Sequence, residues 1–220
     1  FSAGLAIEGL KPFTTIYSTF LQRAYDQLIH DVAVQNLDVM FALDRSGLVG
    51  EDGPTHSGNY DIAYLRCIPN MIICTPSDEN EARHLLTTAY LNKGPASVRY
   101  PRGIGPNTKI NEDLDPFDIG KAKLIIKGSP KIIILNFGAL ISEAKEVASS
   151  LELTLIDMRF VKPLDEEILK EYLSKADWFI TIEDGSIMGG AGSSVQEFCS
   201  REGINIKSIL FGIPDKFIDH

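Results

Sequence analysis

The chain has 220 residues, of which 44% are hydrophobic and 23% are charged, values typical of a globular protein with one large domain or two smaller ones. Its formal net charge of -9, with no basic block to offset it, argues against a nucleic-acid partner. No apolar run has the length of a membrane span and no signal peptide is recognisable, so we expect no membrane contact and a cytoplasmic location. The cysteines, Cys67, Cys74 and Cys199, lack metal or CxxC spacing and are expected to be free and buried.

Strands alternate with helices in the first half of the chain. The expected strands are 13–17, 38–43, 71–74 and 95–100, and the expected helices are 2–9, 19–32, 60–65 and one that opens at Ser77. Thr19 and Gln22 fit a capping box at the start of the second helix. This alternation indicates parallel strands joined by right-handed crossovers, so the first half is predicted to form an open, doubly wound α/β sheet.

The segment 44–58, DRSGLVGEDGPTHSG, directly follows the second expected strand and contains four glycines and a proline. These residues exclude a helix or a strand interior. Long loops inside compact domains are usually functional or disordered. Because Leu48 and Val49 stand among varied polar groups, the composition favours an ordered, functional loop.

Ligands of open α/β sheets bind beyond the carboxyl ends of the strands. This rule predicts that residues following three of the strands share one edge: Tyr17, Phe20, Arg23, Asp44, Arg45, Asp52, His56 and Arg102. Arginines and aromatic rings on one edge favour an anionic ligand with a flat ring. Taken singly, each arginine is most simply a solvated surface charge, and Phe20 or His56 an ordinary core or loop residue. The prediction therefore depends on their convergence.

A polar segment with two prolines and no periodicity, 105–118, is expected to be a linker between a domain at 1–104 and a domain at 119–220. The second domain shows the same alternation. Its expected strands are 131–135, 153–157, 178–182 and 206–210, and its expected helices are 140–151, 165–174 and 192–202. The predicted fold class is therefore α/β, with two consecutive open, mostly parallel sheets.

A glycine-rich run, GGAGSS at 189–194, opens the last expected helix. Its backbone amides could hold an anion. Tight packing of that helix on its sheet is the interpretation we favour, since a lone glycine-rich turn is weak evidence of a ligand. No cluster of His, Cys or carboxylates has metal-ligand spacing, so no metal site is predicted in this chain.

Six segments carry a likeness to a known family: YSTFLQRAYDQ (17–27), DRSGLVGEDGPTHSG (44–58), TPSDENE (75–81), YPRG (100–103), GGAGSSV (189–195) and GIPDKFIDH (212–220). Together they resemble the 1-deoxy-D-xylulose-5-phosphate synthases, which are transketolase-like thiamine diphosphate enzymes. GEDGPTH is shared by the wider transketolase family, whereas YSTFLQRAYDQ and DRSGLVG distinguish the synthases from the other members. The resemblance covers essentially the whole chain and implies the central pyrimidine-binding domain, incomplete at its start, and most of the C-terminal domain, incomplete at its end.

The resemblance implies a transferase that condenses pyruvate with glyceraldehyde 3-phosphate, releasing CO2 and giving 1-deoxy-D-xylulose 5-phosphate for isoprenoid and thiamine biosynthesis. The implied cofactors are thiamine diphosphate and Mg2+. The metal ligands, the diphosphate motif and the glutamate that protonates the aminopyrimidine are expected in an N-terminal portion outside this chain, so the chain alone is expected to be inactive. A homodimer in the cytoplasm, or in a plastid, is the expected setting.

By the same resemblance, Phe20 stacks on the cofactor's aminopyrimidine, and Arg45 and Arg102, with Tyr17 as a neutral donor, bind the substrate's phosphate. Arg23, one turn along from Phe20, is expected to face the same site and to bind substrate. The implied catalytic groups are His56, which would bind the donor carboxylate or relay a proton, and Asp52, which would orient that ring or hold the acceptor's hydroxyls. Two alternatives stay open. One is a β subunit of a 2-oxo-acid dehydrogenase, which naturally lacks the diphosphate domain. The other is a non-catalytic, truncated dimerisation module.

Overall fold

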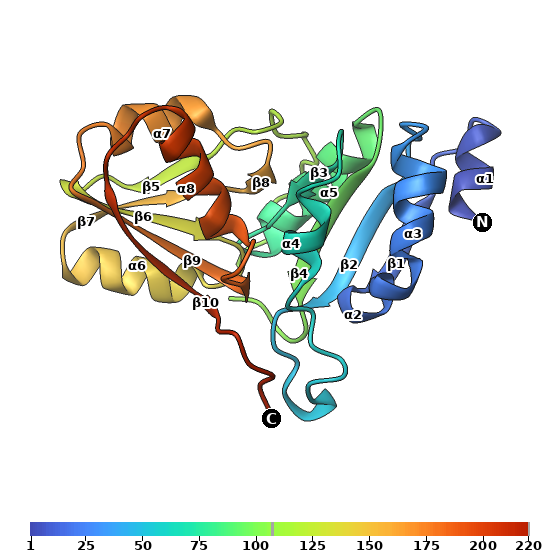
Figure 1. Cartoon of the computed structure of the whole chain (residues 1–220), viewed down its shortest axis with the longest axis horizontal. Helices are drawn as coiled ribbons and strands as arrows, with labels where there is room; N and C mark the ends of the chain where they lie inside the picture. The colour runs from blue at the N-terminus through green and yellow to red at the C-terminus, as the bar shows by residue number, and fades with distance from the viewer. Residues whose placement is uncertain (107, 220) are drawn as a thin grey trace.

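A computed structural model describes residues 1–106 and 108–219, which form two α/β units side by side (Figure 1). Asn107, in the predicted linker, and His220, at the end of the predicted second domain, lie outside the described residues. Each unit is built on a five-stranded, mostly parallel sheet. The predicted fold class is therefore confirmed.

The first sheet has the strand order β1-β2-β4-β3-β8, and its first four strands are parallel. These strands are β1 (Phe13–Tyr17), β2 (Met40–Ser46), β3 (Ile72–Cys74) and β4 (Ala96–Pro101). The α-helices of this unit are α1 (Ser2–Ile7), α2 (Ser18–Leu21), α3 (Tyr25–Gln27), α4 (Asp61–Leu65) and α5 (Glu79–Leu91). The run 40–43 is buried throughout, as expected for a parallel strand covered on both faces.

The predicted helix at 19–32 is interrupted. The chain forms α2, a 3-10 turn (Gln22–Ala24), α3 and a π-helical segment (Leu28–Ala33). The buried stripe is present, since Leu21, Leu28 and Val32 are all buried. The predicted capping box is wrong, because α2 begins at Ser18 directly after β1 and the Thr19 hydroxyl instead donates to the carbonyl of Thr55, 3.0 Å away. Thr19 thereby ties the helix start to the long loop.

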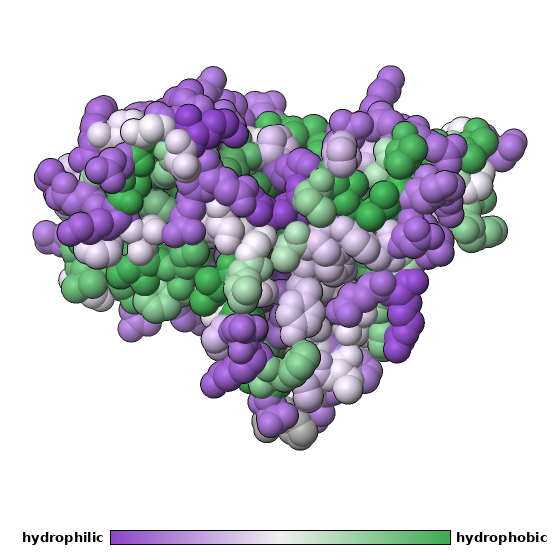
Figure 2. Space-filling model, in the orientation of Figure 1, coloured by the Kyte–Doolittle hydropathy of each residue, from purple (hydrophilic) through white to green (hydrophobic). Residues whose placement is uncertain are grey.

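The second sheet has the order β10-β9-β6-β7-β5. Its strands are β5 (Lys123–Ile126), β6 (Ser129–Phe137), β7 (Leu153–Asp157), β9 (Trp178–Ser186) and β10 (Lys207–Ile213), and its helices are α6 (Ile141–Ser150), α7 (Glu166–Leu173) and α8 (Ala191–Arg201). Only β5, which the sequence did not predict, runs antiparallel to its neighbour. The edge strand β10 leaves Ile209 and Phe211 exposed, and Figure 2 shows hydrophobic surface on this unit.

A short strand from the second unit completes the sheet of the first. β8 (Phe160–Lys162) lies antiparallel to β3, with Lys162 opposite Ile73 and Phe160 opposite Cys74. The amide of Thr75 adds a 2.7 Å hydrogen bond to the carbonyl of Arg159. The two units therefore share a sheet, although the sequence placed no strand at 160–162.

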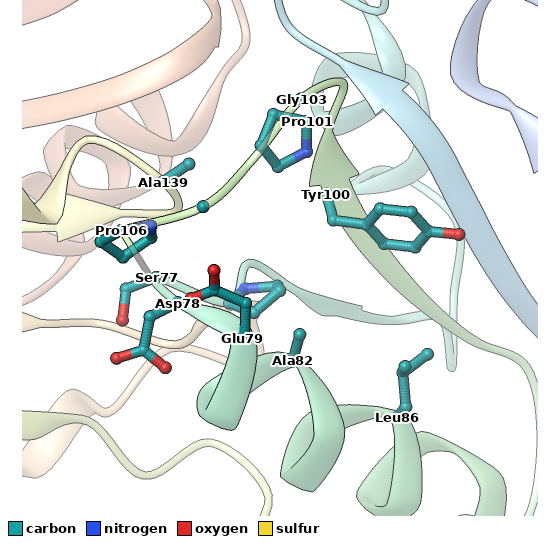
Figure 3. Close-up of a pocket in the computed structure, with 12 residues that line it drawn as sticks. Ser77, Asp78, Glu79, Ala82, Leu86, Tyr100, Pro101, Gly103, Pro106 and Ala139 are labelled. Atoms are coloured by element: carbon teal, nitrogen blue, oxygen red, sulfur yellow. The ribbon is translucent and has the colours of Figure 1, made fainter. Parts of the chain in front are cut away.

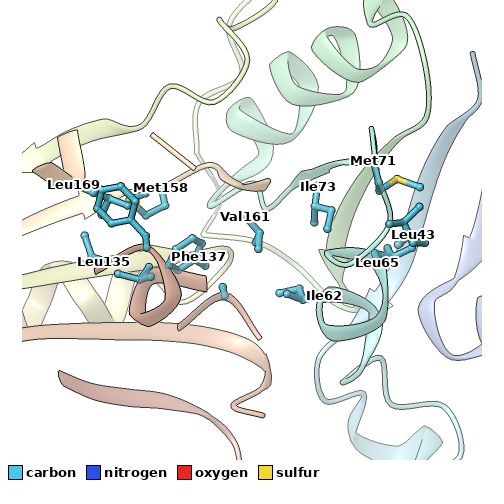
Figure 4. Close-up of a cluster of buried hydrophobic side chains, with 14 of the residues drawn as sticks. Leu43, Ile62, Leu65, Met71, Ile73, Leu135, Phe137, Met158, Val161 and Leu169 are labelled. Atoms are coloured by element: carbon cyan, nitrogen blue, oxygen red, sulfur yellow. The ribbon is translucent and has the colours of Figure 1, made fainter. Parts of the chain in front are cut away.

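One hydrophobic core runs through both units. Leu43, Ile62 and Ile73 of the first unit belong to the same buried cluster as Phe137 and Val161 of the second (Figure 4). Each fully buried side chain of this size contributes about 1.5 to 3 kcal/mol relative to an exposed one. The shared core and sheet hold the second unit against the carboxyl ends of β2 and β4.

The predicted linker is packed against α5. The His84 ring of α5 hydrogen-bonds through Nδ1 to the carbonyl of Asp115 at 2.6 Å and stacks on Phe117, with ring centroids 4.8 Å apart. The guanidinium carbon of Arg159 lies 3.8 Å from the Phe117 ring centroid. Phe117 thus ties the linker to both units. The boundaries at 104 and 119 stay predictions.

The three cysteines differ in burial. Cys74 and Cys199 are buried as expected, but Cys67 is exposed, which contradicts the expectation for that residue. Over residues 1–106 and 108–219, no helix combines the length and the apolar character that crossing a membrane requires.

Candidate functional site

The long loop after β2 is ordered and closed at its base. Gly47 and Gly58 exchange two backbone hydrogen bonds of 2.9 Å, which join the strand end to the chain entering α4. A Cβ on Gly58 would lie 2.3 Å from the carbonyl oxygen of Arg45, so only glycine fits there. We call this two-glycine contact the neck of the loop. At the far end, Gly50–Asp52 forms a 3-10 turn.

Aromatic rings meet where β1 ends. Tyr17 and Phe20 stack with ring centroids 5.3 Å apart and an interplanar angle of 12°. The His56 ring, brought in by the loop, meets Phe20 edge-on at 5.4 Å. The guanidinium carbon of Arg23 lies 5.8 Å from the Phe20 centroid, and Phe20 remains 36% exposed. An exposed ring beside an imidazole and a cation suits a flat heterocycle.

Arginines and carboxylates form the second part of the cluster. Arg45 places its guanidinium carbon 3.9 Å from the Tyr17 centroid and pairs through Nη1 with Asp44 at 2.7 Å. Asp52 lies between two arginines, with its Oδ2 3.5 Å from Arg45 Nε and 3.2 Å from Arg102 Nε. Arg102 also donates from Nη1 to the carbonyl of Val49 at 3.2 Å. The carboxylate thus holds both guanidinium groups at one place.

The structure brings together the eight residues predicted for this edge, which are Asp44 and the seven site residues Tyr17, Phe20, Arg23, Arg45, Asp52, His56 and Arg102. Their roles stay predictions. One expected contact differs, because Asp52 faces the arginines and the His56 ring bonds through Nδ1 to the Thr55 hydroxyl at 3.0 Å. In this structure Thr55, rather than Asp52, orients the imidazole.

Arg45 carries two features that are typical of functional positions. Its φ of +58° places a non-glycine residue in the left-handed region. Its buried Nε lacks a hydrogen-bond partner among the described residues, since the 3.5 Å separation from Asp52 is long for a hydrogen bond. A buried donor without a partner is costly and is suited to an anionic ligand oxygen.

Beneath the loop lies a buried ionic network that the sequence analysis missed. Arg99 of β4 donates from Nε to both carboxylate oxygens of Asp61, at 3.1 and 3.0 Å. It also donates from Nη1 to Asp184 of β9, and from Nη2 to the carbonyl of Gly58 at 3.3 Å. The side chains of Arg99 and Asp61 are 2% and 0% exposed. An arginine inside the apolar strand ASVRYP was the available signal, because a buried charge requires a partner.

The glycine-rich run at 189–194 is occupied by the chain's own carboxylate. The amides of Ala191 and Gly192, at the start of α8, each donate to Glu183 at 2.8 Å. A Cβ on Gly192 would lie 2.5 Å from the Thr181 hydroxyl, so the helix packs closely on its sheet. This confirms the packing interpretation of the run. Burial raises the pKa of Glu183 from its ordinary 4.5 to about 7, although the two amides act in the opposite direction.

The raised pKa of Glu183 predicts a pH dependence of stability. Since the folded chain takes up this proton at higher pH than the unfolded chain, the associated stability is fully present below pH 4.5 and is lost as the pH rises to about 7. Between about pH 5 and about pH 7.5, we expect the free energy of unfolding of the wild type to fall by about 2 kcal/mol relative to a Glu183→Gln variant. Urea titrations of both proteins measure this difference.

A matched control is Glu143→Gln, which neutralises an exposed glutamate in the first turn of α6. Its pH profile should be parallel to that of the wild type. Parallel profiles for the wild type and Glu183→Gln would contradict the assignment.

A separate cavity of about 300 Å³ lies between the first turns of α5 and the segment that follows β4 (Figure 3). Its walls are largely apolar and include Ala82, Leu86, Tyr100 and Pro106. None of the seven site residues lines it. The cavity is therefore distinct from the cluster described above.

The described residues contain no group of three or more His, Cys, Asp or Glu side chains that could hold a metal ion. The cluster fits an organic cofactor better, because it offers an exposed ring, an imidazole and guanidinium donors. The cluster and the two open α/β sheets indicate a protein that binds an organic cofactor beyond the carboxyl ends of its parallel strands. The comparisons with known families agree with this class.

Residues 1–107 match the model of the transketolase pyrimidine-binding domain, and residues 120–220 match the model of the transketolase C-terminal domain. The chain therefore belongs to the transketolase family of thiamine diphosphate-dependent proteins. Within this family it is 58% identical, over its whole length, to 1-deoxy-D-xylulose-5-phosphate synthases of Stutzerimonas stutzeri and Pseudomonas aeruginosa. The chain spans 34% and 35% of the length of these relatives.

Solved structures give the same fold. A split-gene transketolase, described as an inactive beta4 tetramer, superimposes with a TM-score of 0.88 at 28% identity, covering 98% of this chain and 71% of that one. A transketolase from Campylobacter jejuni superimposes with a TM-score of 0.74 at 20% identity, covering 99% of this chain and 33% of that one, which supports the fold alone.

Proposed function

We propose that the chain is the pyrimidine-binding and C-terminal part of a 1-deoxy-D-xylulose-5-phosphate synthase, which condenses pyruvate with glyceraldehyde 3-phosphate and releases CO2. The observation that carries this proposal is the convergence of Phe20, His56, Arg45 and Arg102 at one sheet edge, from segments far apart in the sequence. The sequence identity of 58% to a 1-deoxy-D-xylulose-5-phosphate synthase, over the whole chain, supports this particular reaction within the transketolase family.

The site fits the cofactor of this reaction. Thiamine diphosphate, when bound, supplies a nucleophilic carbon and accepts the electrons released by decarboxylation. In this proposal the exposed ring of Phe20 lies against the aminopyrimidine, since it is the accessible flat surface of the cluster. The His56 imidazole, beside Phe20, hydrogen-bonds the donor carboxylate or moves a proton at the acceptor carbonyl.

The cations of the cluster fit the acceptor's phosphate. Arg23, Arg45 and Arg102 carry three positive charges against two from Asp44 and Asp52, which leaves an excess of one near the ring. Guanidinium groups match phosphate oxygens in geometry as well as charge. Tyr17, whose ring supports Arg45, is proposed as a neutral donor to the same phosphate. Asp52 fixes the spacing of two of the arginines.

The direct test uses the full-length protein that contains this chain, loaded with thiamine diphosphate and Mg2+. Pyruvate and glyceraldehyde 3-phosphate should give CO2 and a five-carbon ketose phosphate in equal amounts, detected by mass spectrometry. Transfer of an acyl group to a lipoyl acceptor without ketose phosphate would indicate the 2-oxo-acid dehydrogenase alternative. No product with folded, cofactor-loaded protein would contradict both enzymatic functions.

A Phe20→Ala variant tests the cofactor contact. Loss of the flat ring should weaken thiamine diphosphate binding by about ten- to a hundredfold, because aromatic contacts of this kind contribute about 1 to 3 kcal/mol. Titration calorimetry on the full-length protein measures the dissociation constant. Phe13→Ala is a matched control, since Phe13 is also an exposed phenylalanine, at the far end of β1. Unchanged affinity of Phe20→Ala would remove Phe20 from the cofactor site.

Several parts of the proposal stay predictions. They are the homodimer, the Mg2+ ion held by residues outside this chain, the cytoplasmic or plastid location, and the roles in isoprenoid and thiamine biosynthesis. The inactive tetramer is a property of the split-gene transketolase to which the chain is similar.

A further inference from the structure

The neck of the long loop is held by the second unit as well as by its own. Gly47, with a φ of +74°, lies against Asp184: a Cβ there would be 3.0 Å from the Asp184 carbonyl oxygen and 3.1 Å from its carboxylate. The amide of Ser186 donates to the carbonyl of Asn59 at 2.7 Å, directly after the neck. The end of β9 is thus packed along the neck.

Arg99 joins Asp184 to the other side of the neck. Its three guanidinium nitrogens hold three different groups: Asp61 at the start of α4, the Gly58 carbonyl in the neck, and Asp184. The Ser46 hydroxyl, which donates to Asp61 over 3.4 Å, adds the end of β2 to this network. Although burial alone would lower the pKa of Arg99, Asp184 and Asp61 outweigh it and hold that pKa above its usual range. The guanidinium is therefore a permanent, buried charge.

We propose that Asp184 is a positioning residue for the active-site loop, acting from the second unit through Arg99 and the neck. Asp52 and His56 lie on the loop, and Arg45 lies directly before its neck at the end of β2, whereas the Asp184 carboxylate pairs with Arg99. Because the two backbone hydrogen bonds of the neck close the loop and join it to the end of β2, a shift of the neck is passed to all three groups. The C-terminal domain thereby acquires a function in setting the geometry of a site built on the first unit.

A purely structural function for Asp184 predicts something different. If the Asp184–Arg99 ion pair only held the two units together, its loss would loosen the whole interface. The interface has a second such pair, in which Arg66 binds Glu197 through both nitrogens, with Nη1 3.0 Å from Oε1. This pair involves neither Arg99 nor a residue of the neck, so it provides the control. The two variants are Asp184→Asn and Glu197→Gln.

Hydrogen exchange on the full-length protein tests the positioning directly. The reporters are the amides of Gly47, Gly53, His56 and Gly58, all of which make backbone hydrogen bonds within the loop. Asp184→Asn should exchange these amides about tenfold faster or more, while amides of β3 and α5 keep the wild-type rate. Glu197→Gln should leave the loop unchanged. Arg99 keeps its two bonds to Asp61 in Asp184→Asn, so the variant is expected to fold. Unchanged loop exchange, or faster exchange everywhere, would overturn the proposal.

Steady-state kinetics then test whether the position of the loop affects the reaction. Of the two experiments, only this one rests on the proposed function. Asp184→Asn should lower kcat/KM for the two substrates by about tenfold or more, because groups of the loop are displaced. The dissociation constant of thiamine diphosphate should change less than kcat/KM does, since Phe20 lies on α2 and is linked to the loop only through the His56 ring contact and the Thr19–Thr55 hydrogen bond among the contacts described above. Faster loop exchange with wild-type kinetics would overturn a function of Asp184 in catalysis. A wild type without activity would contradict the proposed function, and the exchange result would still decide whether Asp184 positions the loop.

Discussion

Replacing Arg102 with Ala in the full-length protein is expected to raise KM for glyceraldehyde 3-phosphate by about ten- to a hundredfold, while KM for pyruvate changes less than about twofold. Only the acceptor carries a phosphate, and Arg102 is a phosphate-site candidate with a partly exposed guanidinium beside Asp52. A charge-assisted hydrogen bond contributes about 1.5 to 3 kcal/mol, which corresponds to this range. Steady-state kinetics with each substrate varied in turn measure both constants.

Two further variants sharpen this prediction. Arg102→Lys keeps a charge but loses the planar fork, so its KM for the acceptor should lie between those of the wild type and Arg102→Ala. Arg83→Ala removes an arginine of α5 that bonds the Asn111 carbonyl of the linker, and it should leave both constants unchanged. Equal increases in the two KM values of Arg102→Ala would show that Arg102 does not bind the phosphate.

The sequence predicted the elements that have local signals. β1 and β7 were placed at their observed bounds, because apolar and β-branched runs between polar turns specify strands locally. The convergence of Tyr17, Arg45 and Arg102 followed from one rule, since parallel strands direct their carboxyl ends to the same edge. The order of strands and loops therefore determined which residues could meet.

Features that depend on contacts between segments far apart in the sequence could not be predicted. β8 has three residues and becomes a strand only because β3 lies beside it. Asp52 was expected near His56 or the acceptor, but its side chain turns to Arg45 and Arg102, a choice that sequence spacing does not encode. The Arg99 network was missed, and although an arginine in an apolar strand indicates a buried partner, one of its two acids, Asp184, comes from a distant strand.

Asp61→Ala is expected to produce the largest loss of stability, about 3 to 5 kcal/mol in the free energy of unfolding. Asp61 is fully buried and accepts both Nε bonds of Arg99, a bond from the Ile62 amide at 2.9 Å and one from the Ser46 hydroxyl. Its removal leaves a buried guanidinium with one carboxylate and one carbonyl. Because domains are stable by only about 5 to 15 kcal/mol, the variant loses a large share of its folding free energy.

Urea unfolding at neutral pH, followed by circular dichroism, measures this loss. Asp61→Asn keeps the volume but replaces a charge-assisted pair with a neutral one, so a smaller loss of about 2 kcal/mol is expected. Asp31→Ala, which removes an exposed carboxylate beside His30, should stay within about 0.5 kcal/mol of the wild type. If Asp61→Ala is as stable as Asp31→Ala, Arg99 must find another partner or reach water, and the network would then be too weak to fix the neck. The stability of Asp61→Ala and the loop exchange of Asp184→Asn therefore test the same buried Arg99 guanidinium, each through one of its two acidic partners.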